Sequence, residues 1–127
     1  MNSNMNESPF KGKTGLRRVW NAFNYSLSGL RAAYACEDAF RQEALLAVLL
    51  IPLAFYLPVE GIGRALMISS VLLVLIVELL NSAVEATVDR ISLENHRLAK
   101  RAKDIGSAAV LFSLINVVVV WACVLWG

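Results

Sequence analysis

Acidic and amide side chains recur along one otherwise apolar stretch of the chain, from Glu78 to Asp89. Asn81 and Glu85 lie between them, so that steps of three, four and four residues put all four side chains on one face of an α-helix. Ionisable groups in an apolar membrane helix cost at least ~2.5 kcal/mol each at mid-bilayer, and for that reason they usually mark function. The pattern predicts a functional acidic face.

A purely structural alternative is that this face joins neighbouring helices. Asn81 and Ser82 would be enough for that purpose, because uncharged polar side chains already hydrogen-bond between helices. Three carboxylates on one face repel one another and contribute little to helix association without cations. We therefore favour a catalytic role over a structural one.

Spacing along the helix suggests different roles for the acidic residues. Glu78 and Glu85 are separated by about 10.5 Å along the axis, at ~1.5 Å per residue, so one ion cannot be bound by both from the same helix. Glu78 lies deeper in the apolar run and suits a general base for a lipid hydroxyl. Glu85 and Asp89 lie nearer the polar end, where a nucleotide and Mg²⁺ would arrive. Mg²⁺ commonly takes one or two protein carboxylates plus phosphate oxygens, and Glu37 could supply the second.

Positive charge for a phosphate group is available at the start of the last apolar run. Lys103 precedes that run and could neutralise charge on a transferring phosphoryl group. The N-terminus of the helix that follows Lys103 also carries a partial positive charge, which would attract a phosphate group. Gly106 and Ser107 are small, so that helices can approach closely there.

The composition indicates that these residues lie in a membrane protein. The chain has 127 residues, of which 57% are hydrophobic and only 17% are charged, whereas a soluble domain has about 25% charged residues. A net charge of +2, with no basic stretch interleaved with aromatic residues, argues against nucleic-acid binding.

Three apolar runs can be distinguished, at about residues 44–59, 65–89 and 105–126. The third has no charged residue and is long enough for the ~30 Å hydrocarbon core of a bilayer. The first is short and contains Pro52, which a membrane helix tolerates when neighbours satisfy the freed backbone groups. A helical hairpin buried in a soluble bundle is the alternative, and the third run makes it less favourable. We predict three membrane-spanning helices.

Lys and Arg residues predict the orientation. They are concentrated before the first run and between the second and third runs, whereas the link between the first two runs has only Arg64. The positive-inside rule therefore predicts a cytoplasmic N-terminus and second link, and a C-terminus outside the cytoplasm.

An amphipathic helix is predicted before the first span, over about residues 15–43. Its apolar residues recur at steps of four and three: Leu16, Trp20, Phe23, Leu27, Leu30 and Tyr34. Such a helix suits the membrane surface, although it could also pack on the bundle. Residues 1–14 are polar and are predicted to form a disordered tail, which leaves a single domain over residues 15–127.

Four segments carry a resemblance to a known family: residues 29–33, 39–43, 76–90 and 101–109. The sequence resembles the prokaryotic diacylglycerol kinase family over nearly the whole chain from about Gly15. The resemblance implies a homotrimer in the bacterial inner membrane, with a periplasmic C-terminus and with sites shared between neighbouring subunits. It also implies transfer of the γ-phosphate of MgATP to the hydroxyl of diacylglycerol, which gives phosphatidic acid.

The resemblance also assigns roles by motif position. It implies that Glu78 is the general base, and that Glu37 and Glu85 are the metal ligands. Four residues match family positions around the nucleotide and the reaction centre: Asn81, Asp89, Lys103 and Asp104. Further nucleotide positions match Arg18, Tyr25, Glu94, Asn95 and His96, with Asn95 standing where an aromatic residue is expected. Lipid positions match Ala22, Asn24, Ser26, Arg31 and Ser107.

Other functions remain possible from the sequence. Undecaprenol, which relatives of similar architecture phosphorylate, is the alternative lipid. A small oligomeric proton-coupled transporter would need one titrating acid at mid-membrane, whereas here the acids cluster toward one end. A non-enzymatic assembly factor would not need the acidic face. Three helices have too little facing surface to cover three carboxylates, so a partner subunit is also expected on physical grounds.

Overall fold

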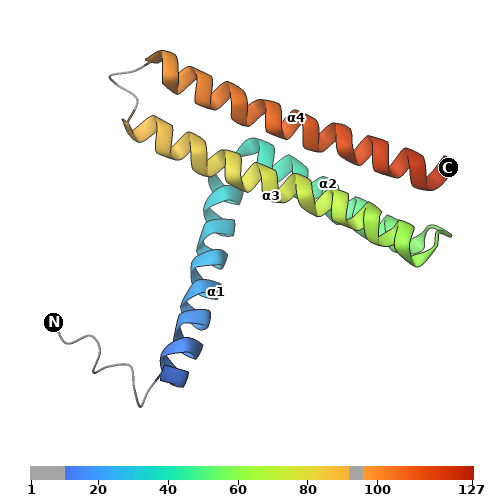
Figure 1. Ribbon diagram of the computed structural model, residues 1–127, viewed down its shortest axis with the longest axis horizontal. Helices are drawn as coiled ribbons and strands as arrows, with labels where there is room; N and C mark the ends of the chain where they lie inside the picture. Colours follow the sequence, from blue (N-terminus) through green and yellow to red (C-terminus); the bar gives the residue numbers. More distant parts are fainter. Residues whose placement is uncertain (1–10, 92–95) are drawn as a thin grey trace. The chain divides into compact units, whose positions relative to one another are not determined.

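The chain is helical throughout the part that the structure describes. The computed structural model describes residues 11–91 and 96–127, and residues 1–10, most of the predicted tail, lie outside them. The helices are α1 (Lys11–Cys36), α2 (Asp38–Tyr56), α3 (Gly61–Ile91) and α4 (His96–Trp126), as drawn in Figure 1. The prediction of an all-α chain is confirmed for these residues.

Three of these helices are long and apolar enough to cross a membrane, as predicted. The spanning segments are Asp38–Tyr56, Gly61–Arg90 and Arg97–Trp126. Each of the three helices begins before the apolar run that predicted it, because helical hydrogen bonding continues through the flanking residues. The first run was predicted to end at residue 59, whereas α2 ends at Tyr56, because Leu57 precedes Pro58 and is extended. α3 contains the whole acidic face as one uninterrupted helix.

Contacts divide the chain into two compact units, residues up to Ala32 and Ala33–Gly127. Most of α1 forms the first unit. Its Trp20 and Phe23 rings are stacked, with centroids 6.2 Å apart, and both side chains are largely exposed together with Leu16. Every side chain from residue 14 to Ala32 is exposed except that of Leu27, which is half-buried.

The helices α1 and α2 meet at Glu37. The predicted surface helix ran to about residue 43, whereas the structure has an extended residue at Glu37, with φ −116° and ψ 111°. Arg41 explains the break, because its Nη1 donates hydrogen bonds to the carbonyl oxygens of Tyr34 (2.6 Å) and Ala35 (3.1 Å) at the end of α1. Its Nη2 also forms an ion pair with Asp38. These bonds satisfy carbonyls that a helix end leaves unpaired.

In the unit Ala33–Gly127, α3 packs against both α2 and α4. Its buried residues lie on one stripe of the helix: Met67, Ser70, Val71, Val74 and Glu78. Ala47 and Ala54 are the small buried residues that α2 contributes. On α4, the Trp121 indole donates a hydrogen bond of 3.2 Å to the carbonyl oxygen of Met67. The core is thus narrow and follows one stripe of α3.

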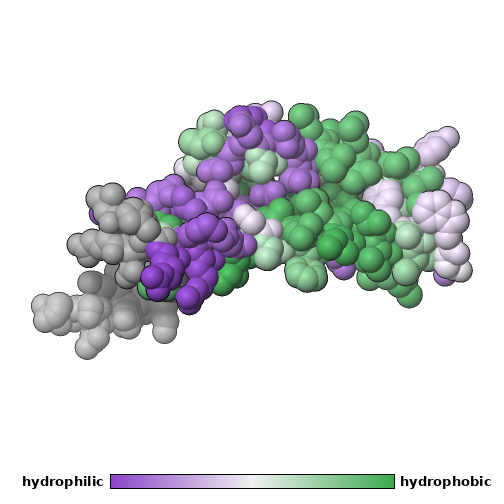
Figure 2. All heavy atoms as spheres, turned by 90° about the horizontal axis from the view of Figure 1, so that it is seen from above, coloured by the Kyte–Doolittle hydropathy of each residue, from purple (hydrophilic) through white to green (hydrophobic). Residues whose placement is uncertain are grey.

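Most of the apolar surface of the three spans is not covered within one chain. In α4, only 6% of its most apolar segment is buried. Figure 2, a space-filling view onto α4, shows hydrophilic residues where that helix begins and hydrophobic residues over most of its remaining length. Such a surface needs an apolar solvent or a partner chain.

Arg64 holds the turn between α2 and α3. The carbonyl of Ala54 would normally accept a bond from residue 58, but Pro58 has no N–H group. Arg64 replaces that donor, since its Nε bonds to the Ala54 oxygen at 3.0 Å and its Nη2 to the Leu57 oxygen at 3.0 Å. The lone basic residue of this link therefore has a structural role.

We expect Arg64→Met to lower the free energy of unfolding by roughly 1–3 kcal/mol, because it leaves two part-buried carbonyls without their charged donor. Thermal unfolding in detergent micelles measures the change. Arg90→Met, at an exposed position near the other end of α3, is the matched control and should change stability little. Equal melting temperatures for the two variants would contradict the structural role.

Candidate active site

The site is centred on Glu78, whose side chain is buried in the α3 stripe at 4% exposure. Three other carboxylates are close enough for their charges to act on it: Glu43, Glu85 and Glu37. They come from α2, from α3 and from the α1–α2 junction. The structure therefore brings together Glu37, Glu78 and Glu85, which the sequence analysis selected from separate parts of the chain.

Glu43 belongs to this cluster and was missed as a site residue. It is half-buried on α2, on the same side as buried Phe40 and Ala47, three residues after one and four before the other. The signal was available in the sequence, because a carboxylate on the inward stripe of an apolar helix is the same anomaly that identified Glu78. The signal is weak because Glu43 ends a charged stretch, Glu37–Glu43, that borders the apolar run.

Asn81 and Gly106 form a close contact between α3 and α4. The Asn81 amide nitrogen donates a 3.4 Å hydrogen bond to Glu85 Oε2, one turn further along α3. The Asn81 Oδ1 atom is buried and has no hydrogen-bond partner among the described residues. A Cβ atom added to Gly106 would collide with this oxygen, so any other residue here would displace the Asn81 side chain from its present position. Gly106, which was predicted to let helices approach closely, therefore lies against Asn81 of α3.

The first turns of α4 contribute a cation, Lys103, to the acidic face. Lys103 Nζ lies 2.6 Å from Asp89 Oδ1 and links α4 to α3. Both side chains are partly exposed, so the attraction itself contributes little stability, but it places an ammonium group at the shallow end of the face.

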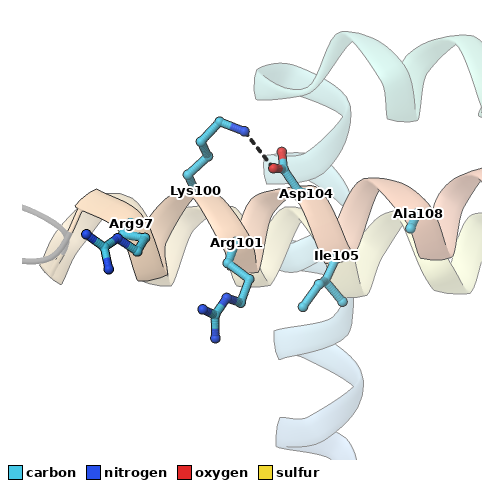
Figure 3. A pocket seen from close by; sticks show the side chains of 6 residues that line it. All are labelled: Arg97, Lys100, Arg101, Asp104, Ile105 and Ala108. Carbon is cyan, nitrogen blue, oxygen red and sulfur yellow. Dashed lines mark hydrogen bonds and ion pairs between the residues drawn. The ribbon is translucent and has the colours of Figure 1, made fainter.

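Asp104 lies on a different side of α4. Its Oδ2 accepts a hydrogen bond of 2.7 Å from Lys100, and both groups are exposed. Figure 3 shows this pair beside a shallow pocket on α4 alone, with Arg97 and Arg101 extending from the same helix. The residues that line this pocket are Arg97, Lys100, Arg101, Asp104, Ile105 and Ala108. The catalytic role given to Asp104 remains a prediction, as does the lipid contact given to Ser107, which is exposed on α4.

The remaining predicted residues lie in other parts of the chain. Six are exposed side chains on α1, within the unit that ends at Ala32: Arg18, Ala22, Asn24, Tyr25, Ser26 and Arg31. Glu94 and Asn95 lie outside the described residues, and His96 is the first residue of α4. The nucleotide and lipid contacts expected of these nine residues remain predictions.

The carboxylates have the chemistry that Mg²⁺ requires. Within residues 11–91 and 96–127, no three His, Cys, Asp or Glu side chains form a group that could hold a metal ion by themselves. A nucleotide-bound Mg²⁺ needs only one or two, since phosphate oxygens and water complete its shell. Glu37 and Glu85 are half-buried oxygen donors near Glu78, and they fit this requirement.

Comparison with known proteins identifies the family. Residues 24–125 match the family model described as prokaryotic diacylglycerol kinase. The chain belongs to this family. The match confirms the resemblance inferred from the sequence, and it includes all four carboxylates of the cluster together with Lys103 and Gly106.

Three diacylglycerol kinases are similar in sequence to this chain over most of their own length. The diacylglycerol kinase of Pseudomonas aeruginosa is 60% identical over 123 residues, which cover 97% of this chain and all of the relative. That of Escherichia coli K12 is 54% identical over 114 residues, 90% of this chain and 93% of the relative. That of Haemophilus influenzae is 54% identical over 113 residues, which cover 89% of this chain and 96% of the relative.

We expect Gly106→Ala to destabilise the protein by roughly 1–3 kcal/mol, because the new Cβ must displace Asn81 from its half-buried position or separate α3 from α4. Gly63→Ala is the matched control. Its Cβ would approach Val124 Cγ1 at 2.9 Å, and that side chain can move by rotation. Thermal unfolding in micelles compares the two variants. A smaller loss for Gly106→Ala than for Gly63→Ala would contradict the proposed close contact.

Proposed function

We propose that this chain transfers the γ-phosphate of ATP to the hydroxyl of diacylglycerol, giving phosphatidic acid and ADP. The observation that carries the proposal is the burial of Glu78 among apolar helices beside three other carboxylates, in a chain whose family relatives are named diacylglycerol kinases. The identity of 54–60% to those relatives favours diacylglycerol over undecaprenol as the lipid.

In the proposed reaction, Glu78 accepts the proton of the lipid hydroxyl while the hydroxyl oxygen attacks the γ-phosphorus. The bond between that phosphorus and the β–γ bridging oxygen breaks, and its electron pair leaves with ADP. Glu78 lies among apolar side chains at the buried end of the acidic face, whereas Asp89, at the other end of that face, is exposed. A lipid hydroxyl would approach from the apolar side and a nucleotide from the exposed end, and this supports Glu78 as the base.

Glu37 and Glu85 would hold Mg²⁺, which when bound supplies electrostatic stabilisation to the transferring phosphoryl group. Asn81 orients Glu85 through its amide hydrogen bond. Lys103 would exchange its contact with Asp89 for the nucleotide phosphates, because a doubly charged phosphate attracts the ammonium group more strongly than one carboxylate does. Further nucleotide contacts are proposed for Asp89, Asp104, Arg18, Tyr25 and the segment 94–96, and lipid contacts for Ser107 and for α1 residues 22, 24, 26 and 31.

We further propose a homotrimer in the bacterial inner membrane, with active sites shared between subunits. The apolar surface left uncovered on α2, α3 and α4 supports an oligomer. The basic residues at the start of α4 support a cytoplasmic position for the α3–α4 link, and with it a periplasmic C-terminus. The exposed aromatic residues of α1 support its placement at the membrane surface. Residues 15–127 would then act as one domain. The tail predicted over residues 1–14 is shorter than expected, because α1 begins at Lys11 and includes the last four of those residues.

Phosphate transfer from labelled ATP to diacylglycerol in mixed micelles tests the proposal. We expect Glu78→Ala to lower kcat by about 10²–10⁴-fold, the usual contribution of a general base, while the oligomer stays intact by size-exclusion chromatography. Glu60→Ala, at an exposed position in the α2–α3 link, is the control and should retain activity. Near-normal turnover in Glu78→Ala would exclude this residue as the base. A wild-type protein that phosphorylates undecaprenol but not diacylglycerol would overturn the choice of lipid.

A second prediction concerns the metal. We expect Glu85→Gln to raise the Mg²⁺ concentration needed for half-maximal activity several-fold while the KM for the lipid changes little, because an amide is a weaker Mg²⁺ ligand than a carboxylate. Titrations of Mg²⁺ at saturating lipid, and of lipid at saturating Mg²⁺, separate the two effects. Equal changes in both would contradict the metal role.

A further inference from the structure

A shallow basic pocket lies on the first turns of α4. Its volume is about 330 Å³, and its charged lining comprises three basic residues and one acidic residue, a net charge of +2. Asp104 is already paired with Lys100, whereas Arg97 and Arg101 are exposed and have no ion-pair partner within residues 11–91 and 96–127. Two guanidinium groups, one helical turn apart, are therefore available to bind an anion. The reaction proposed above uses neither of them.

The side of α4 that carries these two arginines is not the side that meets the acidic face. Lys103, which contacts Asp89 of α3, follows Arg101 by two residues, about 200° around a helix of 3.6 residues per turn. Figure 3 shows Arg101 and Ile105 extending from the same side of α4. An anion held by the arginines would therefore be a different one from the nucleotide phosphates proposed for Lys103.

Further along α4, the same side of the helix is apolar and exposed. Four residues follow Arg101 at steps of four, three, four and three and form what we call the α4 stripe: Ile105, Ala108, Phe112 and Ile115. The change from hydrophilic to hydrophobic residues along α4 is visible in Figure 2. At ~1.5 Å per residue the stripe extends about 15 Å, which is the depth of one leaflet of a ~30 Å hydrocarbon core. Arg101, about 6 Å before Ile105, would lie in the headgroup layer.

We propose that this side of α4 binds one anionic phospholipid of the bilayer, with its phosphate between Arg97 and Arg101 and an acyl chain along the α4 stripe. The inference goes beyond the proposed function, because this lipid is a bound component of the protein and not its substrate. Guanidinium groups donate paired hydrogen bonds to phosphate oxygens, and basic pockets on the cytoplasmic side of membrane helices bind anionic headgroups. The bound lipid would fix the depth of α4 in the membrane, and with it the depth of Lys103.

Affinity for single lipid molecules tests the inference. Native mass spectrometry of the full chain in detergent measures Kd for phosphatidylglycerol and for phosphatidylcholine, which has the same chains and no net charge. We expect the wild-type protein to bind phosphatidylglycerol about tenfold or more tightly than phosphatidylcholine, with roughly fivefold from each arginine. The double variant Arg97→Gln/Arg101→Gln should bind both lipids with Kd values within about twofold of each other. A wild-type protein without this preference would overturn the inference.

Arg90→Gln is the matched control for the single variant Arg101→Gln. It removes the same charge at an exposed position in the last turn of α3, outside the basic pocket. A general attraction of basic residues to anionic lipid predicts equal losses of affinity for phosphatidylglycerol in the two variants. A defined site predicts a roughly fivefold loss in Arg101→Gln and little change in Arg90→Gln. Equal losses would show that there is no site. All of these side chains are exposed, and size-exclusion chromatography checks that the oligomer is retained.

Competition distinguishes a lipid headgroup from a free phosphate group. Glycerophosphoglycerol, which is the headgroup without acyl chains, should not displace phosphatidylglycerol at equal concentration, because it cannot contact the α4 stripe. MgATP should not displace it either. Displacement by glycerophosphoglycerol would show a site for phosphate alone, and displacement by MgATP would make the pocket part of the nucleotide site. Either result would overturn the inference. None of these measurements involves phosphate transfer, so failure of the proposed kinase reaction would leave their outcome unchanged.

Discussion

The burial of the Glu78 carboxylate is the constraint on which the rest of the molecule depends. A carboxylate at 4% exposure in an apolar helix is costly unless neighbouring groups compensate it, and the charged groups that act on Glu78 are themselves carboxylates: Glu43, Glu85 and Glu37. A cluster of like charges favours occupation by cations. In the proposed reaction, Mg²⁺ would reduce this repulsion, and the nucleotide phosphates would complete the shell of the metal.

The polarity of α3 changes gradually along its length, and this gradient separates the parts of the site. Glu78 is buried, Asn81 and Glu85 are half-buried, and Asp89 is exposed. Lys103 meets Asp89 at the shallow end. A substrate with an apolar part and a charged co-substrate can thus approach one face of a single helix from opposite directions.

Several features that fix this geometry lie away from the carboxylates. Arg64 satisfies the carbonyl that Pro58 leaves unpaired, and Arg41 satisfies the end of α1, so that the backbone turns where Glu37 is needed. Gly106 lets α4 approach Asn81 closely. Each feature provides a hydrogen bond or a close contact that an apolar solvent cannot replace.

The three spans and the acidic face of α3 could be predicted from the sequence, because helical periodicity and apolar length are local properties. The family could be predicted from the motifs that the chain carries. The sequence also selected Glu78 and Glu85 correctly as neighbours on one helix. Only the tertiary structure added Glu43 to the cluster, paired Asn81 with Gly106 and ended α1 at Cys36. It also directed Lys103 toward α3 and Asp104 toward Lys100, although the two residues are adjacent in the chain. The reason is that contacts between helices depend on which faces meet, and spacing along a single helix carries no information about its neighbour.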